Sequence, residues 1–228
     1  MDFQISIIIP VFNEHYIINK AIEHLNCLHT TERFEIIVVD GHTSEGTLKA
    51  VKDQRVKKIS SPKGRGIQMN TGAKLASAEI LLFLHADTYL ADSAPELIIN
   101  TLHDQNAVAG AFDLGICSHK AVFRLIEKMV YIRSRLTRIP YGDQGIFIKR
   151  NFFESLGGYG KMPLMEDVDL MRRVKKNGGK ITMVNRKILT SPRRWKKEGV
   201  IFCTLRNWTL ILLYLMGVPA EKLSKFYP

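Results

Sequence analysis

Three short apolar segments constrain the fold of this chain more than any other feature. They are Ser6–Pro10, Glu35–Asp40 and Ile80–Leu84, and their apolar residues follow one another without a polar break. Unbroken apolar strands of this kind occur where helices cover both faces of a sheet. Between them, Glu14–Leu28 has apolar residues at helical spacing, and Gly66–Ala76 is a predicted helix opened by a glycine-rich turn. This alternation predicts an α/β fold with a mainly parallel sheet.

The second half of the chain is less regular than the first. We expect a boundary near residue 110 to separate two lobes of one domain, because the sequence contains no internal repeat and no low-complexity linker. The other predicted elements are a helix at Thr43–Lys52, a strand at Val56–Ile59, an antiparallel strand at Ala107–Ile116, a helix at Val122–Leu136, a strand at Gly145–Lys149, a short helix at Asn151–Leu156 and a helix at Met165–Lys176.

Net charge and cysteine content indicate which kind of partner the protein binds and in which cellular compartment it is found. The chain has 228 residues and a net charge of +11, which favours anionic partners. Nucleotide phosphates and lipid headgroups fit this charge, whereas no recognition-helix or RNA-binding pattern points to nucleic acid. The three cysteines are far apart, which argues against a zinc site or a disulfide framework and suits a reducing compartment. No basic region precedes the first apolar run, so we expect no signal peptide and a cytoplasmic protein.

A basic cluster precedes an apolar segment near the end of the chain. Arg193, Arg194, Lys196 and Lys197 lie just before Val200–Val218. The cluster is either a solvated face or a binding surface. The apolar segment is interrupted by polar residues in its first half, so we do not expect a membrane-spanning helix. The default expectation is a helix buried against the protein, and the alternative is an amphipathic helix in peripheral contact with the inner face of a membrane.

Polar residues follow three of the predicted strands. Pro10–Glu14, Asp40-Gly41 and His85–Asp87 lie at the carboxyl ends of strands, where open α/β sheets bind their ligands. Each could serve alone as a turn or cap residue. Together they bring carboxylates to one edge of the sheet, and their mutual repulsion calls for a cation or a hydrogen-bond donor.

The turns beside these strands suggest a nucleotide. Asp40 can accept hydrogen bonds from a ribose hydroxyl or a base N–H. Lys63, Arg65 and the helix start at Gly66 form a corner suited to phosphate, since helix N-termini attract anions and arginine binds phosphate bidentately.

Two further groups are candidates for chemistry. Asp87 ends an apolar strand, where a carboxylate suits Mg²⁺ or Mn²⁺ bridged to diphosphate oxygens. His85 is a candidate second ligand that would favour Mn²⁺, although hydrogen-bonded packing is the more common role for such a histidine. Glu166-Asp167 either stabilises a helix start or supplies a general base. A third pair, Asp143-Gln144, is a candidate for binding rather than chemistry, through contacts to sugar hydroxyls.

An ordered set of motifs resembles a known family. The segments 10–14, 38–47, 72–78, 85–87 and 166–167 are similar to those of family 2 glycosyltransferases of the GT-A fold, over residues 5 to 195. Within that family, the segments 64–70, 84–88, 142–147 and 163–168 resemble a bacterial subgroup described as radical-SAM/selenodomain-associated, or arsenosugar-biosynthesis, glycosyltransferases.

The resemblance implies a fold, a reaction and a site. It implies a GT-A domain over 1–228, with a nucleotide-sugar-binding half at 1–110, an acceptor half at 111–198 and a helical segment at 199–228. It implies a UDP- or GDP-linked donor, a divalent cation, a small-molecule or lipid-linked acceptor and inversion at the anomeric carbon. Asp87 maps to the last aspartate of the DxD metal motif, with His85 beside it, and Asp167 maps to the catalytic base, with Glu166 beside it. The implied substrate-binding residues are Pro10, Val11, Phe12, Asn13, Glu14, Asp40, Gly41, Arg65, Gln68, Ala86, Gly142, Asp143 and Gln144.

The sequence departs from the family pattern at two motifs. The DxD motif reads His85-Ala86-Asp87, so its first aspartate is missing. The QxxRW motif of processive enzymes is reduced to Arg194-Trp195, with Ser191 in place of glutamine, which speaks against polymer synthesis. Arg194 can still neutralise a departing diphosphate.

Two other functions compete with sugar transfer. A nucleotidyltransferase would place a glycine-rich basic loop after the first strand, where this chain has Val11–Glu14. The missing aspartate and the basic segment before Val200–Val218 instead suit a non-catalytic nucleotide-sugar binder or a membrane-docked protein.

Overall fold

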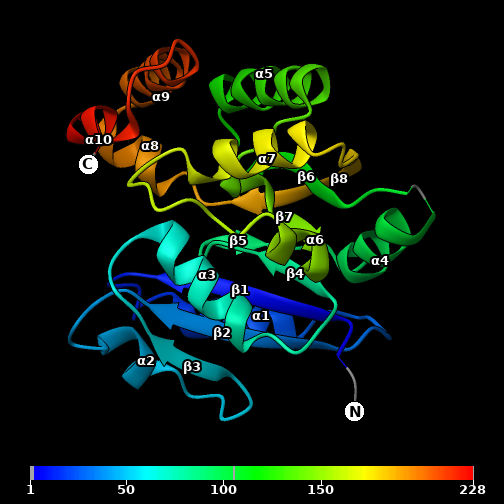
Figure 1. Ribbon diagram of the computed structural model, residues 1–228. Helices are drawn as coiled ribbons and strands as arrows, with labels where there is room; N and C mark the ends of the chain where they lie inside the picture. Colours follow the sequence, from blue (N-terminus) through cyan, green and yellow to red (C-terminus); the bar gives the residue numbers. More distant parts are fainter. Residues whose placement is uncertain (1–2, 105, 228) are drawn as a thin grey trace.

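The computed structural model describes residues 3–104 and 106–227 and contains an eight-stranded sheet with the order β3-β2-β1-β4-β7-β6-β8-β5 (Figure 1). Neighbouring strands from β3 to β4 run parallel, β7 is antiparallel to β4 and β6, and β6 runs parallel to β8. The α/β prediction is confirmed, and the sheet is mixed. The strands are β1 (Ile5–Val11), β2 (Phe34–Asp40), β3 (Lys57–Ser60), β4 (Ile80–Phe83), β5 (Thr88–Tyr89), β6 (Ala109–Ile116), β7 (Ile146–Lys149) and β8 (Ile181–Thr190).

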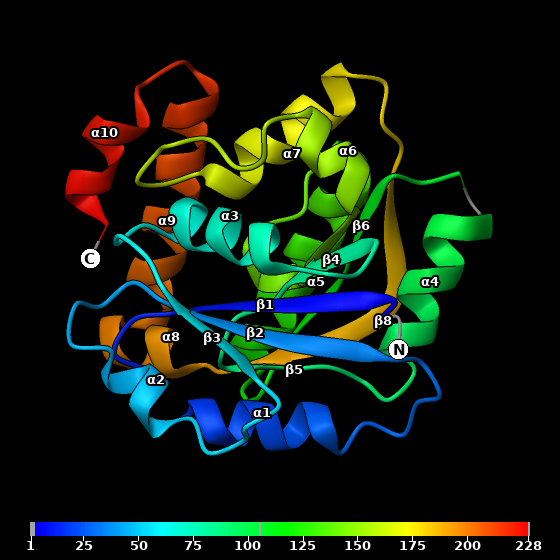
Figure 2. The same cartoon turned by 60° about the horizontal axis from the view of Figure 1, so that its bottom comes forward.

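Helices cover both faces of the sheet. In Figure 2, α1 lies on one side of β1 and β2, while α3 and α7 lie on the other. The helices are α1 (Ile18–Asn26), α2 (Gly46–Ala50), α3 (Arg65–Leu75), α4 (Ala94–Asp104), α5 (Ala121–Thr137), α6 (Arg150–Ser155), α7 (Glu166–Lys176), α8 (Arg193–Glu198), α9 (Val200–Leu215) and α10 (Ala220–Leu223).

Two hydrophobic cores explain why the strands are apolar throughout. Ile7 and Ile9 of β1 pack on the side of α1, together with Ile22. Ile8, between them, packs on the opposite side with Met69 of α3. Successive side chains of a strand point to opposite faces, so a strand covered on both faces must be apolar at every position.

The sheet brings several functional segments to one edge. β1, β2 and β4 all end there, because Ile8 of β1 pairs with both Ile37 of β2 and Phe83 of β4 in parallel register. On the other side of β4, the antiparallel β7 begins at this edge after a 3-10 turn at Gly142–Gln144. The sheet therefore juxtaposes residues from both halves of the chain.

Some boundaries differ from those expected from the sequence. The predicted helix at Thr43–Lys52 is shorter, since Glu45 adopts a left-handed conformation with φ 52° and the helix starts after it. The predicted strand at Ala107–Ile116 is β6, which is antiparallel to β7 as expected but also runs parallel to β8. The elements α4, α8, β5 and β8 are not among those predicted from the sequence.

The expectation that Val200–Val218 packs against the protein is confirmed for one side of the segment only, where Leu210 packs with Ile211 and Tyr214. The helix α9 forms there, and only Cys203 and Leu210 are fully buried. Ile201 is 73% exposed and Leu212 is 60% exposed. Within residues 3–104 and 106–227, no helix is both long and apolar enough to cross a membrane.

Candidate active site

A cavity of about 770 Å³ lies at the sheet edge where β1 and β4 end, and residues at the start of α7 and on α8 line it. This is an ordinary size for a small-molecule site. Most of the predicted site residues line it. They are Pro10, Phe12, Glu14, Arg65, His85, Ala86, Asp87, Gly142, Asp143, Glu166, Asp167 and Arg194.

Three predicted substrate-binding residues instead hold the strand ends together. Gln68, on α3, donates from Nε2 to the carbonyl oxygens of Val11 (2.7 Å) and Val39 (2.9 Å). The amide nitrogen of Gly41 also donates to the Val11 carbonyl, at 3.0 Å. A Cβ added at Gly41 would lie 2.8 Å from Gln68 Cδ, so only glycine fits there without displacing this amide. Val11, Gly41 and Gln68 thus fix the turn that carries Phe12.

Asp40 and Asn13 shape the neighbouring turns. Asp40 is fully buried, and its Oδ1 accepts a hydrogen bond from the His42 amide at 2.9 Å. Its Oδ2 has no hydrogen-bond partner among the residues that the structure describes. A buried carboxylate oxygen normally has a partner, but Asp40 does not line the cavity, so a ligand reaches this atom only if the surrounding turn shifts. Asn13 adopts φ 57° in the turn after β1.

One arginine joins two of the predicted carboxylates. Arg193, the first residue of α8, donates to Glu14 Oε1 at 2.5 Å and Oε2 at 2.8 Å. Its Nε lies 3.4 Å from Asp87 Oδ2. Burial raises the pKa of Asp87, and the Arg193 guanidinium opposes that rise. The sequence placed Arg193 only in a basic cluster, whereas the structure places it against the ends of β1 and β4.

His85 is neutral in this setting. Burial lowers its pKa to about 3, and the guanidinium groups of Arg65, Arg194 and Arg193 act in the same direction. A Cβ added at Gly142 would lie 3.3 Å from His85 Nε2, so the imidazole faces the Gly142 backbone. A neutral imidazole can accept a hydrogen bond or bind a metal ion.

The donor set around Asp87 fits a weakly held divalent cation. The described ranges contain no group of three or more His, Cys, Asp or Glu side chains placed to bind a metal. Asp87 offers a carboxylate to the cavity, and the neutral His85 lies two residues away. Mg²⁺ is commonly held by one or two carboxylates together with substrate phosphates and water, so one carboxylate suffices when a diphosphate supplies other ligands.

Glu166 and Asp167 open α7, as expected from the sequence. The amide nitrogen of Gly142 donates to Asp167 Oδ2 at 2.5 Å, and that of Val168 donates to Oδ1 at 2.8 Å. These bonds fix the Asp167 side chain against the turn before β7. Burial raises the pKa of Glu166, the adjacent Asp167 raises it further, and Arg65, whose Nε lies 3.9 Å away, opposes the rise. Both carboxylates benefit from the helix N-terminus.

The turn at Gly142–Gln144 contributes a second acid and a partner from α5. Burial raises the pKa of Asp143 to about 6, opposed by Arg133. Arg133 lies over the ring of Tyr141 at 3.2 Å and donates to Gln144 Oε1 at 2.7 Å. Gln144 Nε2 donates to the Phe112 carbonyl at 3.0 Å, so this amide is engaged by protein groups. In the sequence, Arg133 is only one of the basic residues on a predicted helix, and nothing there assigns it to the site.

Arg194 is held in place from two sides. Its Nε donates to Glu198 Oε1 at 3.2 Å, and its guanidinium lies 4.1 Å from the centre of the Tyr227 ring. Its Nη1 also donates to the Tyr227 hydroxyl. The guanidinium therefore borders the cavity in a fixed position, with Tyr227 packed against it.

Comparison with known proteins identifies relatives of this arrangement. The model of the family described as glycosyl transferase family 2 matches residues 6–154, which include Asp87 and end before Glu166. A probable glycosyltransferase, YdaM of Bacillus subtilis strain 168, is 25% identical over 85% of this chain and 52% of its own length. The chain spans about half or less of the curated relatives it matches.

Two solved structures share the fold. TarS of S. aureus in complex with UDP-GlcNAc superposes with a TM-score of 0.63 at 16% identity, over 83% of this chain and 58% of that one. A mannosyltransferase from Pyrobaculum calidifontis in complex with GDP-Man and Mn²⁺ gives a TM-score of 0.63 at 20% identity, over 83% and 57%. The predicted GT-A fold is thereby confirmed.

Proposed function

The chain belongs to glycosyl transferase family 2, and on that premise we propose that it transfers a sugar from a nucleotide-sugar donor to an acceptor hydroxyl. The observation that carries this proposal is the single cavity that joins Asp87, at the end of β4, to Asp167, at the start of α7. Asp87 suits a divalent cation that binds the diphosphate of a donor, and Asp167 suits a general base that takes the proton of an acceptor hydroxyl. The two roles need to lie within one site.

The donor half of the cavity has the groups that a nucleoside diphosphate requires. Phe12 is 39% exposed and offers a ring face for a base. Arg65 and Arg194 border the cavity with positive charge for the diphosphate. The relatives crystallised with UDP-GlcNAc and with GDP-Man support a UDP- or GDP-linked donor.

A divalent cation is the second part of the proposal. Asp87, with His85 as a candidate second ligand, would hold Mn²⁺ or Mg²⁺, which makes the nucleoside diphosphate a better leaving group when bound. The mannosyltransferase crystallised with Mn²⁺ supports this assignment. Arg193 pairs with both Asp87 and Glu14. Its guanidinium therefore neutralises part of the carboxylate charge that a divalent cation at Asp87 would also neutralise.

The chemical step that follows is a single displacement. Asp167 takes the proton of the acceptor hydroxyl as the hydroxyl oxygen attacks the anomeric carbon. The bond from that carbon to the diphosphate oxygen breaks, its electron pair leaves with the nucleoside diphosphate, and the configuration inverts. The two backbone hydrogen bonds to Asp167 orient the carboxylate for this role. Glu166 acts beside it, and Asp143 and Gly142 line the same region.

We also propose peripheral contact with the inner face of a membrane through the basic C-terminal region. Lys196 and Lys197 lie on α8, directly before the exposed apolar residues of α9. Anionic lipids attract basic residues beside an apolar surface. Co-sedimentation with vesicles of phosphatidylglycerol, abolished by high salt and absent with phosphatidylcholine alone, is the expected result. Equal binding to both vesicle types would contradict electrostatic docking.

A thermal-shift screen of UDP- and GDP-sugars, each with Mn²⁺, with Mg²⁺ and with EDTA, tests the donor assignment. A donor that binds only the native state raises the melting temperature according to its occupancy. We expect a shift with at least one nucleotide sugar and a smaller one in EDTA. A shift with nucleoside triphosphates alone, followed by pyrophosphate release, would favour a nucleotidyltransferase instead.

A further inference from the structure

Two helices on the same side of the molecule carry exposed apolar stripes. On α5 and on α9, exposed apolar residues recur at alternating steps of three and four, which places each set along one line of its helix. On α5 the stripe is Val122, Leu125, Met129, Ile132 and Leu136, between 36% and 81% exposed. On α9 it is Ile201, Leu205, Trp208, Leu212 and Leu215, between 42% and 73% exposed.

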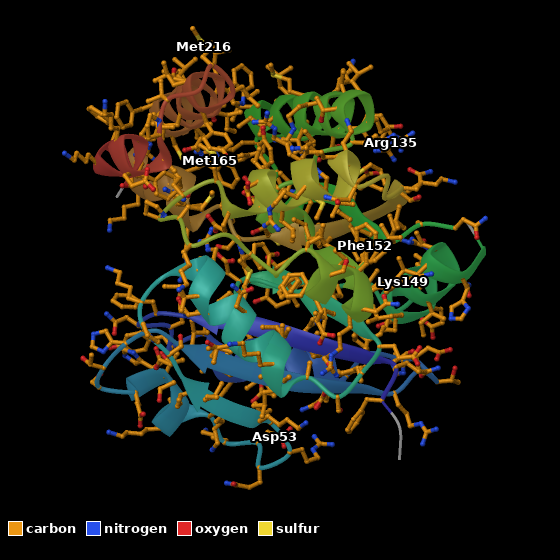
Figure 3. The ribbon with its side chains drawn as sticks, in the orientation of Figure 1. Asp53, Arg135, Lys149, Phe152, Met165 and Met216 are labelled. Carbon is orange, nitrogen blue, oxygen red and sulfur yellow. The ribbon has the colours of Figure 1, made fainter. Side chains whose placement is uncertain are left out.

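These stripes come in addition to the buried sides of the same helices. Phe123 and Ile126 of α5 pack against β6, and Leu210 of α9 packs against residues around the start of α7. Figure 1 shows α5 and α9 above α7, on the side of the molecule opposite β3. Met216, at the outer end of α9, lies at the edge of the molecule in Figure 3 and is 72% exposed. A soluble helix rarely exposes so regular an apolar line without a partner.

The active-site cavity continues between the two helices. Its walls include Ile126 and Val130 of α5 and Trp208 and Ile211 of α9, in the same cavity as Asp167. Two atoms of α9 residues in this wall, Thr204 Oγ1 and Asn207 Oδ1, have no hydrogen-bond partner in the described part of the chain. Both atoms are buried behind the cavity wall, so one end of the cavity is charged and the other is apolar.

The charge around the stripes indicates what covers them. Residues 117–138 and 193–227 together contain thirteen lysines and arginines and only three acids, out of 33 basic and 22 acidic residues in the whole chain. A second copy of the chain would bring the same positive charge against this face, which opposes a symmetric pair. An anionic lipid surface satisfies both the apolar stripes and the basic flanks.

We propose that the cavity between α5 and α9 binds the apolar chain of an amphiphilic acceptor, drawn from an anionic lipid surface on which the two stripes lie. This inference rests on the proposed function, since the hydroxyl of the acceptor must reach Asp167. The apolar chain lies between Val130 and Trp208, and the polar head lies towards Asp167.

The two tryptophans of the chain report directly on this cavity. Trp195 and Trp208 are the only ones, and both line it. An alkyl glycoside with bromine atoms on its chain, used below its micelle concentration, should quench their fluorescence saturably. The same glycoside without bromine controls for other changes in emission. Quenching by the brominated form alone places the chain beside the indoles.

A pair of variants separates the cavity from the stripes. Val130→Asp puts a carboxylate into the cavity wall. It should raise the glycoside concentration that gives half-maximal quenching about tenfold or more, since an unpaired buried charge costs well over 1.4 kcal/mol. Leu125→Asp alters the exposed stripe, 58% exposed, and lies outside the cavity. It should keep the quenching and weaken sedimentation with phosphatidylglycerol vesicles. Thermal melts without ligand confirm that both variants fold.

The outcomes distinguish this inference from the proposed function. If the brominated glycoside does not quench, or quenches Val130→Asp as well as the unmodified protein, the chain does not bind in this cavity. If the protein still hydrolyses a nucleotide sugar in that case, sugar transfer stands and only the amphiphilic acceptor is overturned. If quenching is seen but no nucleotide sugar binds, the proposed function fails and the acceptor role fails with it.

Discussion

Glu35 ties together the amino-terminal ends of β1 and β2, at the edge of the sheet opposite the cavity, and its replacement by glutamine tests how these strands are held together. Its Oε1 accepts hydrogen bonds from Ser6 Oγ of β1 at 2.6 Å and from the Ser77 amide at 2.6 Å. Its Oε2 lies 2.6 Å from Lys57 Nζ of β3. The carboxylate is 5% exposed, so these partners replace most of its water.

The expected loss of unfolding free energy follows from the pKa of the Glu35 carboxyl group. Burial acts to raise it, but the hydrogen bonds from Lys57, Ser6 and Ser77 outweigh burial and lower the pKa from 4.5 to about 2. At about 1.4 kcal/mol for each pKa unit, the ionised form stabilises the folded protein by about 3 kcal/mol at neutral pH. Glu35→Gln keeps an acceptor oxygen and loses the charge, so we expect a loss of about 2–3 kcal/mol.

The pH dependence gives the prediction its sign. A group whose pKa is lower in the folded protein contributes stability above its unfolded pKa, and that contribution is lost as the pH falls through the folded value. For Glu35 the window runs from 4.5 down to about 2. The difference in unfolding free energy between the unmodified protein and Glu35→Gln should therefore be full at pH 7 and shrink steadily below 4.5.

Urea unfolding at several pH values measures this difference, with Glu154→Gln as the matched control. Glu154 is 57% exposed and pairs with Arg150 one helical turn away, so its replacement should cost about 0.3–0.5 kcal/mol. The midpoint should shift at constant slope. A Glu35→Gln midpoint equal to that of the control at pH 7, or a difference that does not change with pH, would refute the role assigned to this carboxylate.

Three further substitutions probe the cavity and its support. Asp167→Asn should lower the rate of sugar transfer about 10²- to 10⁴-fold, the usual contribution of a general base. The control Asp92→Asn, at an exposed position, should leave the rate unchanged. Steady-state kinetics measure both, and an unchanged rate in Asp167→Asn would show that Asp167 is not the base. Phe12→Ala should raise the donor KM by the equivalent of about 1–3 kcal/mol at constant kcat, as loss of base stacking does; a lower kcat at unchanged KM would show another role. Gly72→Ala should destabilise the protein by about 1–3 kcal/mol in thermal or urea unfolding, because the new Cβ would lie 2.5 Å from Ile8 Cγ2; an unshifted midpoint would mean that α3 can move away from β1.

The first half of the fold could be predicted from the sequence because its signals are local. The apolar strand Ile80–Leu84 appears as β4 over Ile80–Phe83, and the helix Gly66–Ala76 appears as α3 over Arg65–Leu75. Strands buried on both faces have an unbroken apolar pattern that is visible in one segment alone. The strand β8 has no such pattern, since residues 185–187 in its middle are exposed. Its pairing with β6 is a long-range contact that no local pattern encodes.

The candidate site likewise contains residues that could be predicted from local sequence signals and residues that could not. Asp87 and Asp167 could be named in advance because strand ends and helix starts are recognisable in sequence. Arg193 could not be assigned to Glu14 and Asp87, because 179 residues separate it from Glu14 and only the folded chain brings them together. The exposure of α9 was also missed, since an apolar segment alone does not reveal whether the protein or another surface covers it.

The most direct test of sugar transfer at this site measures release of nucleoside diphosphate from UDP- and GDP-sugars by the purified protein, with added Mn²⁺ or with EDTA. We expect turnover with at least one nucleotide sugar, loss of turnover in EDTA, and a matching loss in Asp87→Ala that added Mn²⁺ does not restore. Equal turnover by Asp87→Ala and the unmodified protein would contradict the assignment of the site. Failure of every nucleotide sugar to bind or react would contradict the proposed function itself.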